Sequence, residues 1–347
     1  MKQLLLIFTL LLLFSCSKTE LGPQCTDCDE STITSTNNTD VVIINEGNFG
    51  SGSGTLTFYN DSTQVVAQNV FFQKNGFQLG NVAQSITQFN NKAYIVINNS
   101  NKIEIADINN FNSIATITGF NSPRYFLPIN NNKAYVTDLF SNSIQIVDLN
   151  SNTITNSLAV NGWTEQLLLH NDTVYVCDMT NDNILLFNAT TDAFIDSVKV
   201  GTQPNSLVMD ANNKIWILCS GGINETIPQL IKFNPAYRTI EATLPFSSIN
   251  ESPGELKINK AKNTLFFINS AVFKMDITAN TIPTTPIISN NSNIFYGLGI
   301  NPKNTNIYVS DAIDYVQNGT IFRYDSLGTL IHQFPSGIIP GDFMFIE

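Results

Sequence analysis

The stretch Asn132–Asp148 reads N-K-A-Y-V-T-D-L-F-S-N-S-I-Q-I-V-D and contains two strand-like runs around a polar turn at Ser141 and Asn142. The first run centres on Tyr135, and the second alternates apolar with polar residues before it ends in an acid. Such runs, rich in β-branched and aromatic residues and separated by Ser and Asn, predict two antiparallel strands joined by a turn. The same phrase returns along most of the chain, which indicates a repeat protein.

Close copies of this phrase occupy Asn90–Asp107 and Asn171–Asn188, and weaker copies follow towards the C-terminus. Each copy contains one large aromatic anchor. The anchors are Tyr94, Tyr135, Tyr175, Trp216, Phe266 and Tyr308. They are separated by 41, 40, 41, 50 and 42 residues. This period is typical of one four-stranded sheet per repeat, as in the blades of a β-propeller.

A seventh copy is divided between the two ends of the chain. Val41–Asn45 and Thr55–Tyr59 have the two-strand pattern, but no candidate for the innermost strand precedes them. The missing strand is predicted at Pro340–Ile346, which resembles the segments that precede the other anchors. The prediction is therefore an all-β, seven-bladed β-propeller over residues 40–347, whose last strand completes the first blade and leaves no open sheet edge.

The N-terminus has the features of an export signal. Met1, Lys2 and Gln3 precede an unbroken apolar run, which is too short for a membrane span, so residues 1–15 are predicted to be a signal peptide. Leu13-Phe14-Ser15-Cys16 resembles the lipobox of bacterial lipoproteins, and Cys16 is the predicted lipidation site. The lipid anchor would then be the only attachment to the membrane.

Residues 16–39 are predicted to form a flexible linker, because this Ser/Thr-rich segment has almost no apolar surface to bury. Cys25 and Cys28 lie within this linker. The pair is interpreted as a local disulfide or an inert thiol pair, with a metal site as the alternative. Zinc would need four ligands, and no second Cys pair exists. Cys177 and Cys219 fall in anchor strands and are expected to be buried as small apolar residues.

The composition excludes some classes of function. The chain has 17 basic and 28 acidic residues without basic clusters, so nucleic acid is not an expected partner. Catalytic motifs are scarce, and two His residues make His-based acid–base chemistry improbable. Gly50–Gly54 is glycine-rich but lies between two predicted strands with no helix behind it, which indicates a flexible turn rather than a phosphate loop.

A propeller offers a funnel at one mouth of the ring, lined by the first residues of each innermost strand. The candidate ligand-binding residues there are Gln84, Arg124, Tyr125, Trp163, Glu165, Gln166, Asn205, Glu255, Tyr296 and Asp342, with Phe49 and Phe140 as a rim. Aromatic surface combined with a few convergent polar groups is typical of ligand sites. Structural alternatives exist, since the tyrosines could pack within the blades and Arg124 could merely neutralise nearby carboxylates.

The repeated phrase resembles the YncE-like seven-bladed propellers, and the resemblance covers the chain from about residue 40 to the end. The opening Ile43–Tyr59, behind a lipobox and a Thr/Ser-rich linker, is similar to the surface lipoproteins of Gram-negative bacteria that include cobalamin-capturing propellers. That resemblance implies an outer-membrane lipoprotein that binds a corrinoid and passes it to a TonB-dependent transporter.

The expected function is therefore non-enzymatic ligand capture with no cofactor. One alternative is a lactonase-like hydrolase. Its divalent cation would be held by Glu165, Asn205, Glu255 and Asp342. The other alternative is a structural scaffold that presents its acidic outer face to a partner protein.

Overall fold

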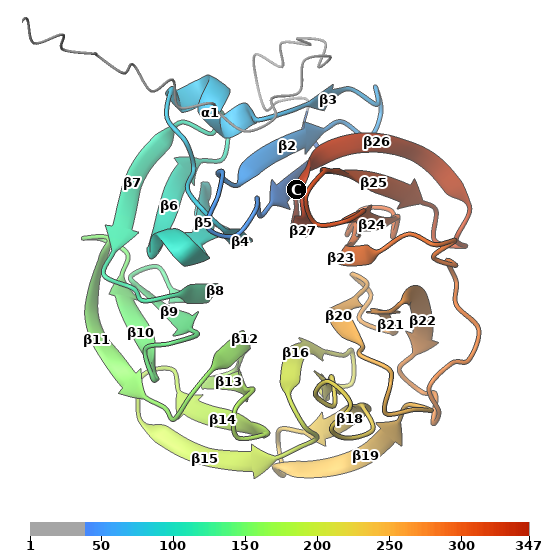
Figure 1. The fold of residues 1–347 in the computed structure, drawn as a ribbon. Coiled ribbons are helices and arrows are strands. Elements are labelled where there is room, and N and C mark those ends of the chain that lie inside the picture. The colour runs from blue at the N-terminus through green and yellow to red at the C-terminus, as the bar shows by residue number, and fades with distance from the viewer. Residues whose placement is uncertain (1–38, 347) are drawn as a thin grey trace, which may run out of the picture.

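The structure, a computed structural model, describes residues 39–346. Its strands form seven antiparallel sheets arranged around a central axis, so the predicted seven-bladed propeller is confirmed (Figure 1). The predictions for the signal peptide, for Cys16 and for the Cys25/Cys28 pair lie outside the described residues.

From the innermost strand outward, blades 1 to 3 are: β27 (Pro340–Phe345), β1 (Val41–Asn45), β2 (Thr55–Tyr59) and β3 (Val66–Ala67); β4 (Ala83–Phe89), β5 (Lys92–Ile97), β6 (Lys102–Asp107) and β7 (Ser113–Thr118); β8 (Pro123–Asn130), β9 (Lys133–Asp138), β10 (Ser143–Asp148) and β11 (Thr153–Ala159). Blades 4 and 5 are: β12 (Thr164–His170), β13 (Thr173–Asp178), β14 (Asn183–Asn188) and β15 (Phe194–Lys199); β16 (Pro204–Met209), β17 (Ile215–Cys219), β18 (Gln229–Asn234) and β19 (Thr239–Pro245). Blades 6 and 7 are: β20 (Gly254–Ile258), β21 (Thr264–Asn269) and β22 (Ala271–Asp276); β23 (Phe295–Ile300), β24 (Ile307–Asp311), β25 (Asn318–Tyr324) and β26 (Leu330–Ile338). A short helix α1 (Val70–Asn75) and a 3-10 turn η2 (Asn98–Ser100) complete the secondary structure of the described residues.

The aromatic anchors connect each blade to the next. Tyr94 of blade 2 lies in one cluster with Phe126 and Val136 of blade 3, and its ring stacks on Phe126 at 4.2 Å between centroids. Alternate residues of the same strand β5, such as Ile95, face blade 1 instead. Successive side chains of a strand point to opposite faces, so each second strand contributes to two interfaces. The core is therefore distributed around the ring, between neighbouring blades.

The first blade is closed by the two ends of the chain, as predicted. Strand β27 pairs with β1 in antiparallel register, with Phe343 opposite Ile43 and Phe345 opposite Val41. Figure 1 shows the red C-terminal strand beside the blue N-terminal one, next to the axis. This pairing leaves no open edge at the seam between the first and last blades.

Two blades depart from the predicted four full strands. Blade 6 has three strands, and a single bridge between Val272 and Ile288 occupies the outer position. Pro283 and Pro286 interrupt this outer segment, and proline cannot donate to a strand ladder. In blade 1 the outer strand is only two residues long. The repeat length alone did not reveal these losses.

Cys177 and Cys219 are buried free thiols of adjacent blades, as expected for small core residues. Burial raises the pKa of the Cys219 thiol to about 12, so it is not a reactive thiolate at neutral pH. No helix within residues 39–346 has the length and apolar character that a bilayer span requires.

Candidate functional site

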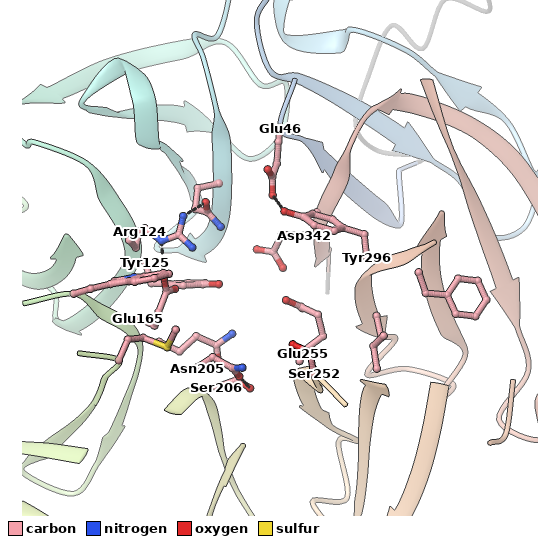
Figure 2. Close-up of a pocket in the computed structure, with 18 of the residues that line it drawn as sticks. Glu46, Arg124, Tyr125, Glu165, Asn205, Ser206, Ser252, Glu255, Tyr296 and Asp342 are labelled. Carbon is pink, nitrogen blue, oxygen red and sulfur yellow. Dashed lines mark hydrogen bonds and ion pairs between the residues drawn. The ribbon is translucent and has the colours of Figure 1, made fainter. Parts of the chain in front are cut away.

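A cavity of about 450 Å³ lies on the axis, at the end of the ring where the innermost strands begin. Each of the seven innermost strands contributes to its wall within its first three residues. These wall residues are Gln84, Arg124, Tyr125, Glu165, Gln166, Asn205, Ser206, Gly254, Glu255, Phe295, Tyr296, Gly341 and Asp342. Loops at the same end add Glu46, Trp163, Met179, Ser252 and Tyr315. Figure 2 shows Tyr125 and Glu165 on one side of the open space and Tyr296, Glu255 and Asp342 on the other.

The structure brings together ten of the twelve predicted binding residues in this one cavity. The other two, Phe49 and Phe140, do not line it. They lie on the β1–β2 and β9–β10 loops at the same end of the blades, with 77% and 71% of their surfaces exposed. The register of the inner strands therefore places the ten converging groups as the repeat predicts, whereas the two phenylalanines belong to the outer loops.

Arg124 organises one side of the cavity. Its Nε lies 2.8 Å from Oε1 of Glu165, and its Nη1 donates to the side-chain oxygen of Gln84. The Trp163 indole N–H donates to the same Glu165 oxygen, and the guanidinium lies over the indole ring at 5.9 Å. Burial opposes the charge of Arg124, but Glu165 outweighs that penalty and raises the pKa of the guanidinium. The predicted neutralisation of a carboxylate by Arg124 is thus present.

Lys257 organises the other side and was not among the predicted residues. Its Nζ lies 3.2 Å from Glu255 Oε2 and 3.8 Å from Asp342 Oδ1. Burial raises the pKa of Glu255, while the two carboxylates overcome burial and raise the pKa of Lys257. A register shift lies between Gly254 and Lys257, and Glu255 has a φ of 57°, so the regular alternation of a strand did not predict that these two side chains lie together.

Glu46 is the second residue that sequence reasoning missed. It follows β1, and its Oε1 accepts a hydrogen bond from the Tyr296 hydroxyl at 2.9 Å. A Cβ atom added to Gly341 would lie 2.8 Å from this oxygen, so the end of the Glu46 side chain lies directly against β27 at this glycine. Burial raises the pKa of Glu46 to about 7, against the lowering effect of the Tyr296 hydrogen bond.

The balance of charge in the cavity favours acceptors. Its carboxyl groups are Glu46, Glu165, Glu255 and Asp342, and the cations that contact them are Arg124 and Lys257. Within the described part of the chain, no ion pair involves Glu46. Aromatic rings complete the walls, with Tyr315 packed edge to face on Tyr296 at 5.8 Å between centroids. The cavity thus offers carboxylate oxygens beside aromatic faces.

The side chains expected for a divalent cation do line this cavity, but their carboxylates are already engaged by protein cations. Glu165 is paired with Arg124, and Lys257 lies beside both Glu255 and Asp342. In residues 39–346, no group of three or more His, Cys, Asp or Glu side chains could hold a metal ion. The donor set of the described residues therefore does not fit the metal-dependent alternative.

Large apolar side chains are exposed at the funnel end of the ring. They lie on loops that join second to third strands or one blade to the next. These residues, hereafter the rim, are Phe49, Phe140, Ile223, Ile227, Ile249, Ile294, Ile313, Tyr315 and Val316. Isolated exposed apolar residues are ordinary, but a set gathered at one end of the molecule is typical of an interaction surface.

The Gly50–Gly54 turn lies among these loops and is held by one side chain rather than arranged around an anion. Asn81 Oδ1 accepts the N–H of Gly50 at 3.0 Å, and Asn81 Nδ2 donates to the carbonyls of Asn48 and Gly52. This agrees with the prediction of a turn between two strands.

The fold and the axial cavity define a seven-bladed β-propeller with a funnel-shaped candidate binding site. Residues 40–336 match the family described as "Domain of unknown function (DUF5074)", and the chain belongs to this family. No curated protein matches the sequence.

Solved structures with the same fold come from several bacteria. A quinonprotein alcohol dehydrogenase-like protein from Bacteroides thetaiotaomicron has a TM-score of 0.72 at 15% identity, over 89% of this chain and 78% of that one. A protein from Lactobacillus plantarum has a TM-score of 0.66 at 12% identity, over 89% and 100%. A functionally unknown protein from Desulfotomaculum acetoxidans has a TM-score of 0.66 at 10% identity, over 88% and 98%. At these identities the similarity shows the fold alone.

Proposed function

We propose that this protein is a non-enzymatic capture protein, which binds a small-molecule ligand at the funnel. The observation that carries the proposal is the convergence of ten predicted side chains, from all seven blades, on one cavity. Because a closed ring of paired strands holds these groups, little ordering would be needed on binding, and preorganised sites bind tightly. The proposal extends to a protein anchored to the outer membrane through lipidated Cys16, with a TonB-dependent transporter as its partner.

The candidate ligand is a corrinoid such as cobalamin. A molecule of that size exceeds a cavity of 450 Å³, so it would lie across the mouth and send amide arms inward. The arms would donate to the carboxylates of the cavity, while Tyr125, Trp163 and the rim would contact the apolar parts of the ligand. The combination of an apolar rim with inward-facing acceptors supports this class of ligand.

The test is the thermal unfolding of the full chain with and without cyanocobalamin. A ligand that binds only the folded state, at 100 times its dissociation constant, adds about 2.7 kcal/mol to the free energy of unfolding. The double variant Trp163→Ala/Arg124→Ala should lose this increase. An unchanged shift in the variant would exclude this face, and no shift in the native protein would exclude the corrinoid.

A further inference from the structure

On two sides of the cavity the carboxylates are paired with protein cations, whereas the carboxyl group of Glu46 has no ion-pair partner among the described residues. Arg124 is paired with Glu165, and Lys257 lies between Glu255 and Asp342. Glu46 accepts a hydrogen bond from the neutral Tyr296 hydroxyl and forms no ion pair among the described residues, and Arg124, whose charge lowers the pKa of Glu46, is already paired with Glu165. Lys257 supplies an alkylammonium to the carboxylates of Glu255 and Asp342, and no lysine among the described residues forms an equivalent ion pair with Glu46.

The surroundings of Glu46 suit an organic cation. Tyr296 donates its hydroxyl to Glu46 and carries Tyr315 against its ring, so aromatic surface lies beside the carboxylate. Across the space, Tyr125 and Trp163 line the opposite wall. Ammonium groups are attracted to the faces of such rings and to carboxylates, and the attraction is stronger where water is excluded.

We propose that the Glu46 end of the funnel binds the ammonium group of a second class of ligand, distinct from the corrinoid, with Glu46 as the counter-ion and the aromatic wall in contact with the body of the amine. This inference rests on the proposed function only in taking the funnel as the ligand site. It assigns a chemical class, an aromatic or apolar amine, to the group that reaches Glu46. The amine would give Glu46 an ion-pair partner of its own, since the guanidinium of Arg124 is paired with Glu165.

Binding of such an amine is linked to ionisation of Glu46. The charged and titratable groups that face this carboxyl are Tyr296, Arg124, Glu255 and Asp342, from four different blades. Burial leaves the pKa of Glu46 near 7, and an ammonium partner would lower it in the complex. Affinity must then rise as pH increases through about 7, by up to tenfold per pH unit below that value.

The experiment is a calorimetric titration of the full chain with tyramine and with its uncharged analogue 4-ethylphenol, between pH 5.5 and pH 8. An alkylammonium stays charged over this range, so any change in affinity belongs to the protein. Tyramine is expected to bind at least tenfold more tightly at pH 8 than at pH 5.5, and 4-ethylphenol to bind more weakly without a pH trend. Equal affinities of the two compounds would overturn the inference.

The matched variants are Glu46→Gln and Glu241→Gln. Glu241 forms its ion pair with Lys214 on the outer surface of blade 5, at 2.7 Å, so its substitution makes the same change of charge away from the funnel. Glu46→Gln should remove the pH trend for tyramine, and Glu241→Gln should keep it. If Glu46→Gln does not fold, the comparison of tyramine with 4-ethylphenol on the native protein still decides whether the ammonium group is bound, since equal affinities overturn the inference.

The outcomes also separate this inference from the proposed function. Binding of cyanocobalamin without binding of tyramine would leave the capture function standing and remove the ammonium site. Binding of neither compound would count against both proposals. Tyramine binding that survives Trp163→Ala/Arg124→Ala and Glu46→Gln would place the amine outside the funnel and overturn the inference.

Discussion

Both the seam between blades 7 and 1 and the funnel contain buried carboxyl groups, but the two regions differ in how many donors and cations surround each carboxyl group. At the seam one carboxylate serves several donors: Asp61 accepts from the Tyr308 hydroxyl and from Asn301 Nδ2, and lies 3.5 Å from Arg323. In the funnel, four carboxyl groups share two cations. The first arrangement satisfies its buried groups internally, whereas the second leaves Glu46 without a cation. A buried cluster that is satisfied stabilises the fold, and one that is not retains capacity for a ligand.

The two clusters also lie at opposite ends of the blades. Strand β2 runs from the funnel end, where Thr55 pairs with Asn45 just before Glu46, to Tyr59 and the loop that carries Asp61. The seam cluster is reinforced by Tyr59, which stacks on Phe334 of blade 7 at 4.1 Å between centroids. The buried Asp61 cluster thus reinforces the seam at the end away from the mouth, whereas at the funnel end the Tyr296–Glu46 hydrogen bond joins the same two blades.

The largest expected effect is a loss of stability on substitution of Asp61 at the seam. Asp61→Ala removes the carboxylate and leaves the buried Arg323 and the Tyr308 hydroxyl without it, so the free energy of unfolding should fall by about 3–5 kcal/mol. Urea denaturation measures this change. As a control, Asp196→Ala removes one member of an exposed ion pair with Arg238 and should cost less than about 1 kcal/mol. Similar losses of free energy for both variants would contradict the view that the buried Asp61 cluster stabilises the fold more than an exposed ion pair does.

The next effect concerns the funnel, where a substitution is expected to increase the free energy of unfolding. The pKa of Glu46 is raised to about 7 from a usual 4.5, so its contribution to stability is complete below pH 4.5 and is lost as pH rises through about 7. Glu46→Gln cannot ionise and should be more stable than the native protein at pH 8, by up to about 3 kcal/mol, with little difference at pH 4. Denaturation at both pH values tests this, and a variant that is less stable at pH 8 would refute the assignment.

A smaller pH effect belongs to the seam. His332 accepts or donates a hydrogen bond with the Tyr59 hydroxyl at 3.1 Å, and burial together with Arg323 lowers its pKa. Its neutral form is favoured in the fold, so this contribution is present above a pH of about 6.5 and is lost as pH falls. His332→Gln should flatten the decline of melting temperature on acidification below that pH. An unchanged slope would show that His332 does not titrate in the fold.

The smallest effect on stability is expected at the rim. Phe140 is 71% exposed, so Phe140→Ser should change the free energy of unfolding by no more than about 0.5 kcal/mol. The same substitution should weaken the binding of cyanocobalamin, measured by calorimetry, because an apolar contact is lost. Leu327→Ser, at an exposed position on the β25–β26 loop at the opposite end, is the control that should bind normally.

Much of the site was predictable because the repeat determines where each inner strand begins. Arg124, Glu165 and Asp342 were identified from such positions alone, and all three line the cavity. Glu46 was missed because it enters from the β1–β2 loop of the divided first blade, past a glycine of the closing strand. The missing fourth strand of blade 6 was not predicted either, since the spacing between anchors does not record how many strands a period contains.

By itself, the sequence determined the all-β class, the seven repeats and the pairing of the last strand with the first blade, because periodic strand patterns and aromatic anchors are local signals. Tertiary structure decided which charges meet. Tyr296 and Glu46 are 250 positions apart in the sequence, and Arg124 is 41 positions from Glu165 and 40 from Gln84. Only closure of the ring brings these partners into contact. Local patterns specify the faces of strands, whereas the burial and neighbours that set a pKa exist only in the assembled core.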